Sequence, residues 1–193
     1  MKKLSIIVPV YNEINTLEII IKKLVNLKLY DDVIKEIIII DDFSTDGSTE
    51  IIKKYEDSYD FIKAYFKKEN KGKGDSQKSA KQFVSGDYVI IQDADLEYDP
   101  EDINKLLKIA IDEKKDFVIG HRLMKTTIKH PYFFFRELAV NSLTLLLNIL
   151  YRTSIKDCAC CYRLFTSDLW KNIDGRADQF EYELCKGDLK NTA

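Results

Sequence analysis

Two carboxylates, Asp93 and Asp95, follow directly behind the apolar run of residues 88–91, with one residue between them. Hard oxygen ligands of this kind suit Mg²⁺ or Mn²⁺, and Mg²⁺ is usually held by one or two protein carboxylates together with substrate phosphates. The pair therefore predicts a site for a divalent metal and a diphosphate, and with it chemistry on a nucleotide. An Asp-x-Asp pair also arises by chance, so the prediction depends on the polar residues that accompany it.

Two further polar clusters follow two other apolar runs of the chain. The sequence VPVYNE, residues 8–13, ends the first run, and Asp41 and Asp42 end the second. Ligands of open parallel sheets bind at the carboxyl ends of the strands, so all three clusters are expected at one edge. Taken singly, the residues also have structural explanations: Tyr11 and Asn12 suit a turn, and Asp41 suits a solvated strand end.

The elements that must position these residues alternate between strands and helices. Apolar runs rich in β-branched residues predict strands over residues 4–10, 36–40, 62–66, 88–91 and 117–120. Helical patterns separate these runs, and their expected caps are Asn15, residues 46–48, Asp75 and Asp99. This alternation predicts an α/β fold with an open, mostly parallel sheet and helices on both faces. The glycine loop at residues 70–74 lacks the ending of a Walker loop, which disfavours ATP hydrolysis.

Composition restricts the class of protein. With 193 residues and 45% hydrophobic content, the chain can bury a full core, and residues 1–193 are expected to form a single domain. The formal charge of -2 argues against nucleic acid as a partner, and the lysines between residues 63 and 81 are interpreted as a solvated face. The four cysteines form neither a spaced disulfide framework nor a recognised zinc motif, which favours the cytoplasm.

No membrane-spanning segment is expected. Pro9 interrupts the first apolar run too early for a signal peptide. Residues 132–151 are apolar but include Arg136, Glu137 and two asparagines, which are too many polar groups for a spanning helix. The segment is expected either to lie against a bilayer surface or to pack as a core helix. The expected location is cytoplasmic, with a peripheral position at the cytosolic face of a membrane as one form of it.

With these residues assembled, the chain resembles glycosyltransferase family 2 of the GT-A fold, and within it the branch that transfers mannose or glucose to polyprenyl phosphates such as dolichol phosphate. Six segments carry the likeness, in order along the chain: VPVYNE at 8–13, DDFSTDGS at 41–48, NKGKG at 70–74, QDADLE at 92–97, GHR at 120–122 and DCACCYRLF at 157–165. The resemblance implies the GT-A nucleotide-sugar transferase fold, a donor of the GDP-mannose or UDP-glucose type, and Mg²⁺ or Mn²⁺ as cofactor. It leaves the base and the sugar open.

The resemblance also implies roles for single residues. Those of the nucleotide-sugar pocket are Pro9, Tyr11, Asn12, Glu13, Asp41, Asp42, Lys73, Gln92, Asp93 and Ala94. Asp93 and Asp95 would hold the metal and diphosphate, and they are expected to be catalytic together with Arg122 and Asp157. Arg122 and Arg136 would receive an acceptor phosphate, because a planar guanidinium fork matches phosphate oxygens. The structural explanations are that Arg136 pairs with Glu137 and that Asp157 caps a helix.

The implied reaction is an inverting transfer by direct displacement at the anomeric carbon. Charge develops on the leaving diphosphate, where a metal clamp stabilises the transition state. A polyprenyl phosphate acceptor is already an anion near neutral pH, since its second pKa is about 6, and it needs no general base. A sugar or protein hydroxyl, the alternative acceptor, needs a carboxylate base, for which Asp157 is the first candidate and Glu181 or Glu183 the next.

The sequence departs from the family pattern at several positions. Phe43 stands where many relatives have glycine, and Asp75 stands where a small residue is usual. After residue 183 the chain turns polar and stops, whereas relatives continue with another strand and a basic loop. The catalytic domain is therefore expected to be shortened at its C-terminus. A shortened nucleotide-sugar binding module with little activity is the second class of function.

Overall fold

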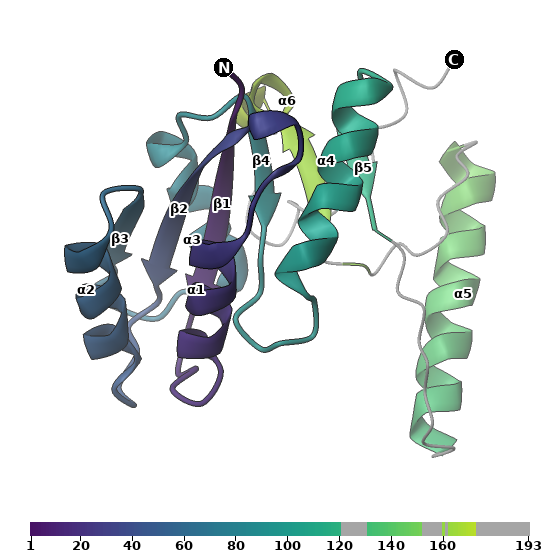
Figure 1. Ribbon diagram of the computed structural model, residues 1–193. Coiled ribbons are helices and arrows are strands. Elements are labelled where there is room, and N and C mark those ends of the chain that lie inside the picture. Colours follow the sequence, from purple (N-terminus) through teal and green to yellow (C-terminus); the bar gives the residue numbers. More distant parts are fainter. Residues whose placement is uncertain (121–130, 152–159, 161, 173–193) are drawn as a thin grey trace.

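A six-stranded sheet forms the centre of the computed structural model, which describes residues 1–120, 131–151, 160 and 162–172 (Figure 1). Its strands are β1 (Lys3–Val10), β2 (Ile34–Asp41), β3 (Ile62–Phe66), β4 (Tyr88–Ile91), β5 (Phe117–Ile119) and β6 (Arg163–Thr166). Their order across the sheet is β3-β2-β1-β4-β6-β5. β1 is parallel to β2 and β4, and β2 is parallel to β3, whereas β6 is antiparallel to both of its neighbours. The sheet is therefore mostly parallel, as predicted.

Helices cover both faces of this sheet, which confirms the second part of the prediction. They are α1 (Leu17–Asn26), α2 (Ser48–Ser58), α3 (Lys73–Ala80), α4 (Ile103–Asp112), α5 (Pro131–Tyr151) and α6 (Ser167–Asn172). Short 3₁₀ turns occur at Tyr30–Asp32, Lys81–Phe83 and Pro100–Asp102. Figure 1 shows α1, α2 and α4 in front of the sheet and α3 behind it.

The core has two layers because the central strands are buried on both faces. Ile6 and Val8 of β1 pack with Ile20 of α1 in one layer, while Ile7 between them packs with Trp170 of α6 in the other. All five side chains are fully buried. Burying one such aliphatic side chain contributes about 1.5–3 kcal/mol, so the continuous apolar runs are what hold the sheet between its helices.

The sequence placed most elements correctly but missed several boundaries. Strands β3 and β4 have the predicted bounds. Asn15 was the wrong cap for α1: the N-cap is Thr16, whose hydroxyl donates to the Glu13 carboxylate at 2.9 Å. Asp75 is not the cap of α3 either, because that helix begins at Lys73. Strand β6 was not predicted.

Helix α5 lies to one side of the sheet (Figure 1). Six of its large apolar side chains are exposed in the described structure: Leu138, Leu143, Leu145, Leu146, Ile149 and Leu150. Such exposure does not fit the core-helix expectation within the described residues. None of the helices in the described part of the chain combines the length and the apolar character that crossing a bilayer requires.

Candidate functional site

The three polar clusters meet at the carboxyl edge of the sheet because their strands are neighbours. β1 lies between β2 and β4, with Val10 opposite Asp41 and Ile7 opposite Ile91. The hydrogen bonds between the strands continue for one residue past the ends of β2 and β4. The backbone amide of Asp42 donates to the Val10 carbonyl at 2.8 Å, and the backbone amide of Gln92 donates to the Ile7 carbonyl at 2.9 Å. Residues far apart in the sequence are thereby brought to one edge, as predicted.

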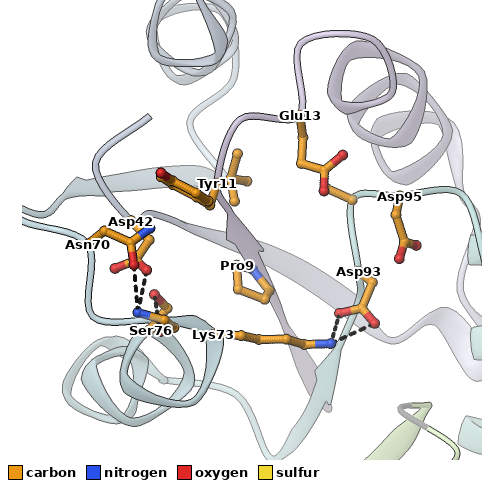
Figure 2. Close-up of a pocket in the computed structure, with 12 residues that line it drawn as sticks. Pro9, Tyr11, Glu13, Asp42, Asn70, Lys73, Ser76, Asp93 and Asp95 are labelled. Carbon is orange, nitrogen blue, oxygen red and sulfur yellow. Dashed lines mark hydrogen bonds and ion pairs between the residues drawn. The ribbon is translucent and has the colours of Figure 1, made fainter. Parts of the chain in front are cut away.

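A pocket of about 320 Å³ opens at this edge (Figure 2). This volume falls within the usual range for small-molecule sites. Its lining residues come from the β1, β2 and β4 ends and from the start of α3: Pro9, Val10, Tyr11, Glu13, Asp42, Asn70, Gly72, Lys73, Ser76, Asp93, Ala94 and Asp95.

Most of the residues expected around a nucleotide sugar line this pocket. Pro9, Tyr11, Glu13, Asp42, Lys73, Asp93, Ala94 and Asp95 do so, whereas Asn12, Asp41 and Gln92 are not part of the lining. Ser76 was missed by the sequence reasoning. A helical repeat could have indicated it, because Ser76 follows Lys73 by three positions and faces the same side of α3. Arg122, Asp157, Glu181 and Glu183 lie outside the described residues, as does the side chain of Arg136.

Asp41 and Asn12 hold the chain around the pocket. The buried Asp41 carboxylate accepts from the Ser44 amide at 3.0 Å and from the Thr49 hydroxyl at 2.6 Å. The side-chain carbonyl of Asn12 accepts from the Thr45 amide at 2.8 Å, and its backbone amide donates to the Ser44 hydroxyl at 3.0 Å. Asn12 therefore joins the loop after β1 to the loop after β2, while Asp41 fixes the loop after β2 to the start of α2.

Gln92 lies beneath the pocket. It is fully buried, and its amide nitrogen donates to the carbonyls of Asp93 at 3.0 Å and Tyr98 at 3.1 Å. Its side-chain oxygen accepts from the Tyr162 hydroxyl at 2.9 Å. Burial raises the pKa of Tyr162, so this hydroxyl stays a donor. Gln92 thus fixes the course of the loop that carries Asp93 and Asp95.

Asp42 holds the glycine loop at the opposite side of the pocket. Its oxygens accept from the backbone amides of Lys71 at 3.1 Å and Gly72 at 2.7 Å. Lys67 supplies the counter-charge, with its ammonium 2.5 Å from Asp42 and 2.6 Å from Asp75. Gly72 has a φ of +85°, a conformation that favours glycine. A buried carboxylate stabilises a structure only when such partners satisfy it, so Asp42 is a clamp on the loop.

The Asp93 carboxylate receives a cation from α3. The Lys73 ammonium lies 2.7 Å from Oδ1 and 2.8 Å from Oδ2 of Asp93. Figure 2 shows the lysine stem extended past Pro9 to this carboxylate, with Asp95 on the same side of the pocket. Asp95 is exposed, and its Oδ1 accepts from the Glu97 amide at 2.9 Å. Two carboxylates and one ammonium therefore face the place where a diphosphate is expected.

The donor set at this end fits a hard divalent ion. Asp93 and Asp95 offer carboxylate oxygens at one side of an open pocket, and the Lys73 contact shows that a positive charge is favourable there. Within the described residues, no group of three His, Cys, Asp or Glu side chains could hold a metal ion. A pair of carboxylates completed by substrate phosphates is the arrangement that Mg²⁺ commonly uses.

Known proteins resemble this chain in sequence and in fold. A family model described as "Glycosyl transferase family 2" matches residues 5–173. Dolichol-phosphate mannosyltransferase of Pyrococcus furiosus is 32% identical over 136 residues, which cover 70% of this chain and 38% of that protein. Cholesterol galactosyltransferase of Borreliella burgdorferi is 44% identical over 93 residues, which cover 48% of this chain and 25% of that protein. The chain thus spans well under half of these curated relatives.

A solved structure shares the fold. The mannosyltransferase of Pyrobaculum calidifontis, solved with GDP-Man and Mn²⁺, superposes with a TM-score of 0.66 at 19% identity. The superposition covers 95% of this chain and 51% of that one. At this identity the likeness concerns the fold alone, and the predicted GT-A fold is confirmed.

Proposed function

Since the chain belongs to glycosyltransferase family 2, we propose that it transfers a hexose from a nucleoside diphosphate sugar to a polyprenyl phosphate, in a metal-dependent reaction that inverts the anomeric centre. The donor would be of the GDP-mannose or UDP-glucose type. We also propose that residues 1–193 belong to one catalytic domain, because a single sheet includes strands from residue 3 to residue 166. The lipid acceptor would bring this domain to the cytosolic face of a membrane.

The observation that carries the proposal is the division of the pocket into two ends. Tyr11, Asp42 and Asn70 lie at the end formed by β1 and β2, where an aromatic ring and polar groups suit a nucleoside. Asp93, Asp95 and Lys73 lie at the end formed by β4 and α3, where the charges suit a diphosphate. A nucleoside diphosphate sugar needs both environments side by side.

The residues of the charged end would assist departure of the diphosphate. As the bond between the anomeric carbon and the β-phosphate oxygen breaks, negative charge grows on that oxygen, and a nearby ammonium stabilises it. Lys73 is placed to donate to such an oxygen. Asp93 and Asp95 would hold Mg²⁺ or Mn²⁺, which when bound supplies further positive charge to the diphosphate. The acceptor oxygen forms its bond from the opposite face of the sugar, which gives inversion.

A phosphate acceptor agrees with the carboxylates of the pocket. The Asp42 carboxylate accepts from the Gly72 amide and pairs with Lys67. The Asp93 carboxylate pairs with Lys73, and the Glu13 carboxylate accepts from the Thr16 hydroxyl. An acceptor that arrives as an anion requires none of them as a base. One of the relatives is named dolichol-phosphate mannosyltransferase, and that name specifies a phosphate as the acceptor. Arg122 and Arg136 are proposed to bind this phosphate.

A hydroxyl acceptor is the second candidate. The relative named cholesterol galactosyltransferase supports it, since cholesterol offers only a hydroxyl. In that case Asp157 is proposed as the general base, with Glu181 or Glu183 in its place if Asp157 is remote. A nucleotide-sugar binding module with little activity is the third candidate.

Transfer assays separate these candidates. Purified protein is incubated with GDP-mannose or UDP-glucose, with Mn²⁺ or Mg²⁺, and with a short polyprenyl phosphate, cholesterol or a simple sugar as acceptor. We expect product only with the polyprenyl phosphate, and a loss of about 100-fold or more in Asp95→Asn. Asp57→Asn, on the exposed surface of α2, is the matched control and should keep full activity. Transfer to cholesterol or a sugar would favour the second candidate, and donor binding without transfer would favour the third.

A further inference from the structure

The contact between Lys73 and Asp93 occupies the oxygens that a metal ion would use. One ammonium bridges both oxygens of the carboxylate, at 2.7 and 2.8 Å. A divalent ion held by the same oxygens would face the ammonium at short range. Like charges at such a distance repel, so the lysine and the ion compete for Asp93.

The two partners differ in their freedom to move. The Asp93 side chain is 9% exposed and stands on the loop that Gln92 fixes from below. The Lys73 side chain is 46% exposed and has four rotatable methylene groups. Of the two partners, the lysine is therefore the one that can change its position at low cost.

A diphosphate gives the lysine another partner in the same pocket. Phosphate oxygens are strong acceptors for a lysine ammonium, and charge-assisted hydrogen bonds to them are among the strongest in proteins. We propose that Lys73 makes cation binding at Asp93 depend on the donor. Without a donor, the ammonium holds Asp93. When the diphosphate enters, the ammonium moves to a phosphate oxygen and Asp93 becomes available to the ion.

This inference rests on the proposed function, and it adds an order of events to it. Because coupling between two ligands is reciprocal, the ion must tighten donor binding by the same factor by which the donor tightens ion binding. The donor would raise the affinity for the ion to some extent even without Lys73, since phosphate oxygens bind the ion directly. Lys73 accounts for the rest of the increase, which disappears when the lysine is removed.

The test is a Mn²⁺ titration of the protein without nucleotide, with free Mn²⁺ followed by electron paramagnetic resonance. The variants are Lys73→Met and, as matched control, Lys71→Met. Lys71 carries the same charge two residues before Lys73 but pairs with Glu69 at 2.8 Å. We expect Lys73→Met to bind Mn²⁺ about tenfold more tightly than the wild type, as removal of a unit charge beside a divalent ion predicts. Lys71→Met should stay within about twofold of the wild type, because its charge is exposed and screened.

The titration is repeated with saturating GDP or UDP. The factor by which the nucleotide raises Mn²⁺ affinity should be smaller in Lys73→Met than in the wild type. A gain of metal affinity cannot come from damage to the fold, which would only weaken binding. If the wild type binds nucleotide with Mn²⁺ but Lys73→Met without nucleotide binds Mn²⁺ no better than the wild type, this inference alone is overturned. If the wild type binds neither GDP nor UDP at any Mn²⁺ concentration, the proposed function is overturned together with it.

Discussion

The hydroxyl of Tyr162 donates to the side-chain oxygen of Gln92 at 2.9 Å, across 70 positions of sequence. Tyr162 directly precedes β6, and Gln92 directly follows β4, so this bond ties the late part of the chain to the loop that carries Asp93 and Asp95. The Tyr98 ring stacks on the Tyr162 ring with centroids 5.1 Å apart, which packs the hydroxyl into a closed environment. The loop that carries Asp93 and Asp95 therefore depends on a contact between two of the sequence motifs, QDADLE at 92–97 and DCACCYRLF at 157–165.

Removal of this hydroxyl should destabilise the protein. Tyr162→Phe leaves the buried oxygen of Gln92 without its donor, and an unsatisfied buried acceptor costs about 1–3 kcal/mol. Urea unfolding should show this loss in the free energy of unfolding. Tyr59→Phe is the control, because the partly buried Tyr59 ring only stacks on Tyr55 and Phe61, and its expected change is below about 0.5 kcal/mol. Equal effects of the two substitutions would contradict the role given to the Tyr162 bond.

The two acids that share Lys67 should respond differently to neutralisation. Asp42→Asn removes the negative charge of the side chain that accepts hydrogen bonds from the backbone amides of Lys71 and Gly72. These bonds to the loop weaken, and the free energy of unfolding should fall by about 1–3 kcal/mol. Asp75→Asn removes a partly exposed partner of the same lysine and should cost less than about 1 kcal/mol. Thermal unfolding measures both, and nucleotide affinity by calorimetry should fall only in Asp42→Asn. If Asp75→Asn lowered stability more than Asp42→Asn, the ion pair with Lys67 would matter more than the hydrogen bonds that Asp42 accepts from the loop.

Glu36 should make stability depend on acid pH. Burial alone would raise the pKa of this carboxyl, but hydrogen bonds from Lys3, Ser5 and Ser85 outweigh burial, and the pKa is lowered from 4.5. A lowered pKa in the folded state contributes stability above the unfolded value, and that stability is lost as pH falls through the folded value. We therefore expect the wild type to be more stable than Glu36→Gln at pH 7, by about 1–3 kcal/mol. The difference should shrink as the pH is lowered below 4.5, the ordinary value for this carboxyl.

Urea unfolding at a series of pH values from neutral to acid measures this difference. Glu113→Gln, an exposed carboxyl just after α4, is the control and should follow the wild type at every pH. A constant difference between the wild type and Glu36→Gln at all pH values would argue against the titration of Glu36 as its source.

Gly86 should tolerate no side chain. A Cβ at this position would lie 2.8 Å from the Lys3 carbonyl and 2.9 Å from the Ser5 amide, both of which are backbone atoms of β1. Because backbone cannot move aside cheaply, Gly86→Ala should destabilise the protein by about 1–3 kcal/mol or more, as overpacking does. The neighbouring Ser85→Ala serves as a comparison, since it loses only the bonds of its hydroxyl to Lys3 and Glu36. A melting temperature of Gly86→Ala equal to that of the wild type would refute the close approach.

The sequence predicted the parallel half of the sheet well, for a physical reason. Strands buried on both faces are continuous apolar runs, and the runs at residues 62–66 and 88–91 match β3 and β4 at both ends. Strand β6 was missed because it has only four residues and begins with Arg163, whose guanidinium donates to the Cys160 carbonyl at 2.9 Å. Its position depends on pairing with β4 and β5, which are distant in the sequence, so the local hydrophobic pattern could not predict it.

The site was predicted at the level of its edge but not of each side chain. Adjacent residues after a strand point to opposite sides, so Asp93 faces the pocket while Gln92 is buried beneath it. The motif QDADLE at 92–97 does not by itself show which of its side chains face the pocket and which are buried. Asp75 was expected to cap a helix, but Lys67, a residue outside the motifs, pairs with it across the loop. The roles of Arg122, Arg136 and Asp157 and the identity of the metal stay predictions.

The position of β6 between β4 and β5 has a consequence for synthesis on the ribosome. β5 pairs only with β6 among the described strands, yet β6 is made more than forty residues later. Strands β1 to β4 can pair with one another as soon as they emerge, and only the second edge of β4 is left for β6. The segment with β5 must wait with unpaired backbone groups until Arg163–Thr166 leaves the exit tunnel. A nascent chain arrested before that point would be the form most in need of a chaperone.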